Sequence, residues 1–199
     1  MIYVISIITA VICFTATFIG GNIIFELDKA AIVENAQIIE PRQKLVTVDL
    51  INSQGKRVSN EVFTKQWSLL SFGSTSCQSP CNRNLYQFNR ELPLMDSTSR
   101  KIHFAFITTD PRTDTWKKMQ TYLNKINPAI TGYTGSPQQI RKLAKSLGID
   151  DLRKLNQSQL SSYYLINPLG YLTAVYTPVE ETGKLAVDLS KLIGNKTSL

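Results

Sequence analysis

Two short apolar runs constrain the fold of this 199-residue chain more than any other feature. Trp67 to Phe72 and Ile102 to Ile107 are each long enough for a buried strand and too short for a buried helix. Strands that alternate with helices pair through right-handed crossovers, so the sequence predicts an α/β protein whose central sheet has helices on both faces. The helices are indicated by apolar residues three or four positions apart, Leu85, Phe88 and Leu92 after the first run and Trp116, Met119 and Leu123 after the second.

Turn and cap residues indicate the remaining elements. A hairpin is expected between Leu45 and Val58, and another between Tyr163 and Tyr176 with its turn at Asn167 to Gly170. Asp114 is expected to cap the helix that carries Trp116. The other expected elements are a short strand near Ile130, a helix from the Ser136 cap to Leu147, and a last helix from Leu185 to Ile193. With a cysteine pair after the first buried strand, this order is typical of a thioredoxin-like domain.

The first 25 residues carry no charged side chain, and the run from Ile2 to Gly21 is long enough to cross a bilayer core of about 30 Å. No Lys or Arg precedes the run, and the small-residue pattern of a cleavage site is poor, so an uncleaved anchor is favoured over a signal segment. We expect residues 1–25 to form a transmembrane anchor or signal segment, residues 26–42 a stalk, and residues 43–199 the folded domain. The domain is expected to face the periplasm or another extracytoplasmic space.

The formal charge of +7 is unevenly distributed. Residues 101–154 contain ten Lys or Arg against four Asp, which indicates a basic surface. Such a surface could favour nucleic acid, an anionic membrane or an acidic protein partner. The basic residues alternate with apolar ones at helical spacing, as in Arg141 and Lys142 beside Ile140 and Leu143, which indicates an ordinary solvated helix face. We therefore expect no nucleic-acid partner.

Cys77 and Cys81 are the candidate chemical centre, because the third cysteine, Cys13, lies in the uncharged leader. Without Cys13, two Cys and one His remain, which is too few for a closed four-ligand zinc site of Cys and His. One thiol at a strand exit and one in the first turn of a helix can approach within disulfide reach, and the helix dipole favours the thiolate of the second. Two thiolates also suit Cu(I). The alternatives are a reduced packing pair and a static structural disulfide.

Four segments resemble, in order, motifs of the Sco family, also called SenC, whose members are membrane-anchored copper-handling proteins with a thioredoxin-like fold. Phe72 to Cys81 resembles the family's FG-x-T-x-C-x-x-x-C segment, without the prolines usual after each cysteine. Thr108 to Thr115 resembles S-V-D-P-x-R-D-T, with the arginine one position early. Ile130 to Gly135 resembles the G-L-T-G stretch, and Tyr164 to Gly170 the Y-L-I-D-P-x-G hairpin. The resemblance covers most of residues 43–193.

The resemblance implies a copper site with one ligand changed. Family members complete it with a histidine nine residues before the hairpin proline, and Gln159 stands at that position here. Glutamine is a poor Cu(I) ligand, so a site at Cys77 and Cys81 is expected to hold copper more weakly. Asp110, whose counterpart lies close to the site in the family, could orient a metal, a thiol or a partner, or could cap its loop. His103, the only histidine, is expected to pack as a strand residue.

Three functions follow as hypotheses. The first is an anchored Sco-like protein that serves cytochrome c oxidase assembly, by copper delivery or by reduction of the oxidase's copper-binding cysteines. The second is a thiol-disulfide oxidoreductase without copper, which needs only Cys77 and Cys81. No proline precedes Tyr163, where typical thioredoxin-like oxidoreductases carry one, and this counts against the second. The third is a degenerate relative that acts as a binding module through its basic face, against which the intact cysteines argue.

Overall fold

The computed structural model describes Val33 and residues 35–76, 83–97, 99–155, 157–177 and 181–194. The chain divides into two units between Glu34 and Asn35. Apart from Val33, the first unit lies outside the described residues, and so does the predicted anchor at residues 1–25. None of the helices that the structure does describe is long and apolar enough to cross a membrane. The fold below is therefore that of residues 35–194.

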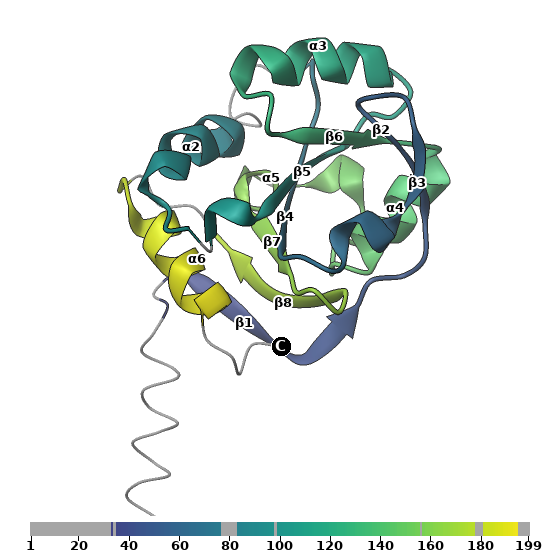
Figure 1. The fold of residues 1–199 in the computed structure, drawn as a ribbon. Coiled ribbons are helices and arrows are strands. Elements are labelled where there is room, and N and C mark those ends of the chain that lie inside the picture. The colour runs from purple at the N-terminus through teal and green to yellow at the C-terminus, as the bar shows by residue number, and fades with distance from the viewer. Residues whose placement is uncertain are drawn as a thin grey trace, which may run out of the picture. The chain divides into compact units, whose positions relative to one another are not determined.

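Within the described part of the chain, eight strands form one sheet in the order β1-β8-β7-β4-β5-β6-β2-β3 (Figure 1). The central strands β4, β5 and β6 run parallel to one another. All other neighbours in the sheet are antiparallel. The strands are β1 Ala36–Lys44, β2 Asp49–Asn52, β3 Arg57–Ser59, β4 Ser68–Gly73, β5 His103–Thr108, β6 Thr131–Thr134, β7 Tyr163–Ile166 and β8 Tyr171–Tyr176. The two buried strands predicted from the apolar runs are confirmed as β4 and β5.

The helices at the predicted places are α2 Arg83–Glu91, α3 Trp116–Ile126, α4 Pro137–Lys145 and α6 Lys184–Gly194. The sequence pattern did not predict α5 Gln157–Ser161 or the 3-10 helices η1 Asn60–Phe63, η2 Leu92–Leu94, η3 Ser99–Lys101 and η4 Leu152–Lys154. Each of these elements has at most five residues, which is too short to repeat an apolar spacing.

Helices pack on both faces of the sheet, as predicted. Ile107 of β5 and Ile140 of α4 belong to one core cluster. Successive side chains of a strand point to opposite faces. On the other face, Phe104 of β5 stacks on Phe88 of α2 with ring centroids 4.0 Å apart. Helices α3 and α6 both contact α2. The sheet is therefore the middle layer of three, and both faces of β4 and β5 are buried.

The predicted stalk is wrong over its second half, because residues 36–42 lie in strand β1. Residues Ala36–Ile38 pair with Tyr176–Ala174 of β8, and Gln43 and Lys44 pair with Leu172 and Tyr171 after an irregularity in the register. None of the nine residues of β1 is fully buried. An edge strand of this kind has no apolar alternation to reveal it, because its side chains are polar or only half covered.

Helix caps fix where several elements begin. Thr115, not Asp114, caps α3, since its hydroxyl oxygen accepts a hydrogen bond from the Lys118 N–H at 3.3 Å. The predicted Ser136 cap of α4 is confirmed. The buried carboxylate of Glu91 accepts hydrogen bonds from the N–H groups of Gly183 and Ala186 at the start of α6. Glu91 thus joins the end of α2 to the start of α6.

Candidate functional site

The candidate site lies where the parallel strands β4 and β5 end. Gly73 and Thr108 are paired neighbours at the carboxyl ends of these strands. The Thr109 N–H donates a 2.7 Å hydrogen bond to the Gly73 carbonyl, so the two chains remain joined as they leave the sheet. Crevices at the carboxyl ends of parallel strands are frequent ligand sites in α/β proteins. The predicted Cys77 and Cys81 follow β4 directly, but residues 77–82 lie outside the described residues.

Asp114 holds the segment that leads to Cys77. Its side chain is fully buried and accepts hydrogen bonds from the Thr75 N–H at 3.1 Å, from the Thr75 hydroxyl, and from the Thr108 hydroxyl at 2.7 Å. The ammonium of Lys118 lies 3.7 Å from the Asp114 carboxylate and donates a 3.0 Å hydrogen bond to the Ser76 hydroxyl. This aspartate therefore ties the exit of β4 to the exit of β5 and to α3.

Asp114 does not cap α3, contrary to the expectation from its position before the helix. A cap faces the N–H groups of its own helix, whereas the carboxylate of Asp114 faces two strand ends. The signal that could have found this role is the hydroxyl at each strand end: Thr108 ends β5 and Thr75 comes two residues after β4. Two such donors need an acceptor once they are buried.

Gln159 lies on α5, which is attached to the start of α2. The Asn84 side chain, itself fully buried, donates a 3.2 Å hydrogen bond to the Leu160 carbonyl. The hydroxyl of Tyr163, the first residue of β7, donates a 2.6 Å hydrogen bond to the Asn84 carbonyl. Asn84 stands three residues after Cys81 in the sequence. The structure thus brings the element that carries Gln159 to the helix that follows the cysteine segment.

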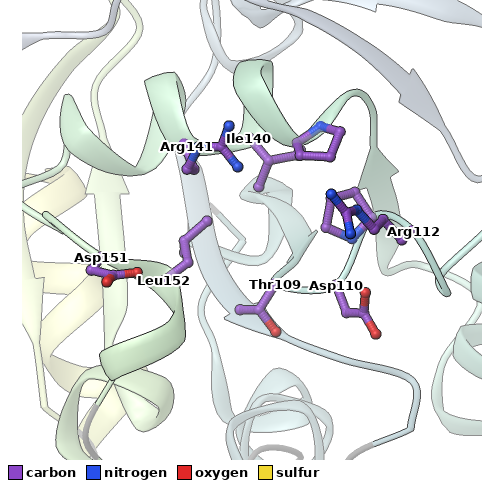
Figure 2. A pocket seen from close by; sticks show the side chains of 9 residues that line it. Thr109, Asp110, Arg112, Ile140, Arg141, Asp151 and Leu152 are labelled. Carbon is purple, nitrogen blue, oxygen red and sulfur yellow. The ribbon is translucent and has the colours of Figure 1, made fainter.

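Asp110 lies in the turn after β5 and lines a pocket of about 430 Å³. Its backbone carbonyl accepts hydrogen bonds from the N–H groups of Thr113 and Asp114. Its own N–H donates to the Thr108 hydroxyl at 2.9 Å. Figure 2 shows the Asp110 side chain beside Thr109, with Arg112 and Arg141 in the upper part of the pocket. These hydrogen bonds involve only the Asp110 backbone, and its side chain lines the pocket, so a loop-capping role of the carboxylate stays an expectation.

His103 lies at the other end of β5 from the candidate site. It is the first of six strand residues, so about 17 Å of extended chain separates it from Thr108 at about 3.3 Å per residue. Its Nε2 lies 3.1 Å from the Tyr133 hydroxyl and its Nδ1 3.4 Å from the Ser68 hydroxyl. Burial lowers the pKa of His103 below its usual 6.5, and a backbone hydrogen bond with Val62 opposes that shift. The packed-residue interpretation of His103 is confirmed.

Within the described ranges, no group of three His, Cys, Asp or Glu side chains is arranged to hold a metal ion. The candidate copper donors Cys77 and Cys81 are outside those ranges, so this finding does not include the two thiols. The described side chains that border the segment offer hydroxyl, amide and carboxylate oxygens. Oxygen donors are hard ligands, and Cu(I) prefers soft ones. Any Cu(I) site here depends on the two thiolates.

The fold and the site together define a thioredoxin-like α/β protein, in which a buried strand and a helix flank a segment with two cysteines. The chain belongs to the SCO1/SenC family, whose model matches residues 39–194. The resemblance found in the four sequence motifs is thereby confirmed. Two of those motifs, Thr108 to Thr115 and Tyr164 to Gly170, form the exit of β5 and the hairpin of β7 and β8.

Relatives and solved structures agree with this assignment. Sco1 of Schizosaccharomyces pombe is 30% identical over 149 residues, which are 71% of this chain and 56% of that protein. The chain spans between 29% and 62% of the length of three curated relatives that it matches, this one included. A crystal structure of Arabidopsis thaliana ScoI with copper bound shares the fold, with a TM-score of 0.63, 24% identity, and coverage of 76% of this chain and 99% of that one.

The same fold occurs in BsSco, described as a member of the Sco family of cytochrome c oxidase assembly proteins with a disulfide switch. That match has a TM-score of 0.59 and 21% identity, and covers 80% of this chain and 99% of that one. At this level of identity the likeness concerns the fold alone.

Proposed function

We propose that this protein handles copper or exchanges thiols through Cys77 and Cys81 during assembly of the copper centre of cytochrome c oxidase. One observation carries the proposal: in a member of the SCO1/SenC family, the strand end that leads to Cys77 is held by a buried carboxylate, Asp114. A held strand end gives the adjacent thiol a defined position, and positioned groups react faster than free ones. Whether the protein transfers copper or electrons then depends on the chemistry of the cysteine pair.

Copper is the first proposed substrate. Two thiolates from Cys77 and Cys81 would give a soft two-sulfur site for Cu(I). Gln159, at the position of the family histidine, would supply at most an amide oxygen, so copper would be held less tightly and released more readily. Support comes from the copper-bound state of the Arabidopsis relative and from the attachment of α5 to the start of α2.

Thiol exchange is the second proposed activity. In this case the Cys77 and Cys81 dithiol reduces a disulfide of the partner, two electrons and two protons pass to the partner, and the pair becomes a disulfide. Ser162 precedes β7, where a general oxidoreductase would carry proline, so we expect a narrow choice of partners. The disulfide switch named for BsSco supports this alternative. A degenerate relative without cysteine chemistry, acting only as a binding module, is the third candidate.

We propose that the domain is held at a membrane by residues 1–25 and faces the periplasm or another extracytoplasmic space. The absence of charge over a bilayer-spanning length supports this. Membrane fractionation tests it: the protein should sediment with membranes and be released by detergent but not by salt. A mature protein that begins near Asn22 and stays in the soluble fraction would contradict the anchor.

The experiment that tests the function is a copper titration of the full chain in neutral detergent, with the cysteines reduced and then oxidised. We expect the reduced protein to bind one Cu(I) per chain, and we expect binding to be lost in the oxidised protein and in the Cys77→Ser variant. Cys13→Ser is the matched control, because it removes a cysteine outside the pair. A reduced protein that binds no copper but cycles between dithiol and disulfide would support thiol exchange. A protein that neither binds copper nor cycles between dithiol and disulfide would support the third candidate, the binding module.

A further inference from the structure

Helix α3 presents a basic depression directly beside the segment that leads to Cys77. The depression has a volume of about 410 Å³ and its lining contains three lysines and no acidic residue. We call this surface the basic shelf. It is lined by Thr75, Lys117, Lys118, Thr121, Tyr122 and Lys125.

The basic shelf adjoins both ends of the cysteine segment. At one end, Thr75 lines the shelf, and Lys118 donates a 3.0 Å hydrogen bond to the Ser76 hydroxyl, one residue before Cys77. At the other end, helix α2, which begins at Arg83, contacts α3. The pKa of Tyr122 is raised to about 12, first by burial of its hydroxyl and then by the charge of nearby Tyr86 and Asp114. A molecule bound on the shelf would therefore lie close to the residues that precede and follow residues 77–82 in the sequence.

Two lysines of the shelf have no acidic partner among the described residues. Lys117 and Lys125 are exposed, and neither forms an ion pair within the described part of the chain. The Lys117 ammonium lies 5.3 Å from the centre of the Trp116 ring. Lys118 differs from them, because it already pairs with Asp114. The buried hydroxyl of Tyr122 also lacks a hydrogen-bond partner among the described atoms. The shelf therefore carries positive charge that no acidic side chain of the described residues neutralises.

We infer that the basic shelf is the docking surface for an acidic face of the protein whose thiols or copper site Cys77 and Cys81 serve. This inference rests on the proposed function, because it assigns the shelf to the partner of the cysteine pair. Transfer of copper or of electrons between sulfur atoms requires contact, so the partner must cover the surface beside Cys77. Complementary charge at that surface would steer the partner and speed the encounter.

A protein fits the shelf better than other polyanions. Tyr86 is 60% exposed beside Tyr122, and tyrosine is enriched at protein interfaces. Single-stranded nucleic acids stack successive bases on several aromatic side chains along a groove, whereas Tyr122 is the one aromatic residue of the shelf lining and Tyr86 lies outside that lining. Membrane-surface helices place large apolar side chains beside their basic ones. The lining of the shelf contains no large aliphatic side chain.

The test measures binding of two labelled peptides without cysteine to the full chain in neutral detergent at low salt. The peptides differ only in that glutamates in one are glutamines in the other. We expect the glutamate peptide to bind about tenfold tighter, and Lys117→Glu/Lys125→Glu to abolish the difference, because each reversed lysine turns attraction into repulsion. The matched control is Lys142→Glu/Lys145→Glu on α4, which changes the net charge equally on other exposed lysines and should keep the preference.

An equal loss in both double variants would overturn the inference, because it would mean that only net charge matters. The inference would also be overturned if Lys117→Glu/Lys125→Glu kept the preference for the glutamate peptide. Vesicles of anionic phospholipid and a DNA oligonucleotide serve as competitors, and stronger binding of either to the shelf would overturn the choice of a protein partner. Reduction of a small neutral disulfide and copper titration report the proposed function separately. If the protein binds copper or reduces the disulfide but shows no shelf-dependent peptide binding, only the docking surface is refuted. If it shows shelf-dependent peptide binding but neither binds copper nor reduces the disulfide, only the proposed function is refuted.

Discussion

Asp114 shows at the residue scale how one buried side chain can organise a site. Its oxygens meet donors from Thr75, Thr108 and Lys118, which lie after β4, at the end of β5 and on α3. A buried carboxylate is costly unless it is hydrogen-bonded, and here the donors compensate that cost. The same contacts that satisfy Asp114 also fix the chain just before Cys77. Stability and site geometry therefore depend on the same residue.

We predict that Asp114→Asn lowers the free energy of unfolding by about 2 kcal/mol, because the amide replaces an acceptor oxygen with a donor group that faces other donors. Denaturation of the full chain by urea measures the change. The Cys77 thiol should also react faster with an alkylating reagent under native conditions, since its neighbouring residues are less firmly held.

Asp150→Asn is the matched control for this prediction, because Asp150 is exposed. Its effect should stay within about 0.5 kcal/mol. If Asp114→Asn has no larger effect than Asp150→Asn on stability, then the contacts of Asp114 do not hold the strand ends together.

Gln159 is the second residue whose replacement is informative. We predict that Gln159→His tightens copper binding at least tenfold, or about 1.4 kcal/mol, because a neutral imidazole is a better copper ligand than an amide oxygen. The gain should be larger for Cu(II), which prefers nitrogen donors more strongly. Competition titration of the reduced and folded protein provides the measurement.

Gln138→His is the matched control, since Gln138 is exposed on α4. It adds the same imidazole away from α5 and should leave copper affinity unchanged. An affinity of Gln159→His equal to that of the natural chain, with the fold intact, would mean that this position no longer faces a copper site. The thiol-exchange alternative would then be favoured.

At the scale of elements, the edges of the sheet carry the main difference from expectation. Strand β1 covers the edge of β8, which would otherwise expose unpaired N–H and C=O groups. Exposed strand edges promote aggregation. Ile39 of β1 also packs against the core cluster. The folded domain therefore includes residues 36–42, which were expected to belong to a stalk.

We predict that a chain shortened to begin at residue 43 is less stable than one that begins at residue 35, because it loses most of β1. The midpoint of thermal unfolding should fall by roughly 5 °C or more, which corresponds to the loss of about 2 kcal/mol. The shorter chain should also aggregate at lower concentration. Equal midpoints for the two chains would show that β1 contributes little to the fold.

At the scale of the whole molecule, the stability of the domain should depend on pH through one side chain. His103 is the only histidine of the chain, and burial lowers its pKa from 6.5. The folded state therefore holds it neutral, while the unfolded state takes up a proton near pH 6.5. The stabilisation is fully present above that pH. It is lost as the pH falls toward the lowered pKa of the folded state.

We predict that the free energy of unfolding falls between about pH 7.5 and 5.5, where histidine is the ordinary side chain that titrates. His103→Gln should flatten this dependence, because glutamine does not titrate. Urea denaturation at a series of pH values measures both proteins. A slope that is the same in the variant would assign the pH dependence to other groups.

The sequence by itself determined much of this protein. Buried apolar runs identified β4 and β5, helical spacing identified α2, α3, α4 and α6, and turn residues such as Asn167 identified the hairpin of β7 and β8. These signals are local, because each depends on side chains a few residues apart. The motif resemblance added the family and pointed to Cys77, Cys81, Asp110 and Gln159.

The tertiary structure alone decided which distant segments meet. Parallel pairing brings the residues after Gly73 beside those after Thr108, and it puts His103 at the opposite end of the sheet. Asp114 could not be distinguished from a helix cap until its donors Thr75, after β4, and Thr108, at the end of β5, were placed around it. Strand β1 was not predicted for the same reason, since an edge strand is defined by its pairing with a partner strand and not by the spacing of its own apolar residues. Pairing between residues far apart in sequence leaves no periodic trace along the chain, so only the folded structure reveals it.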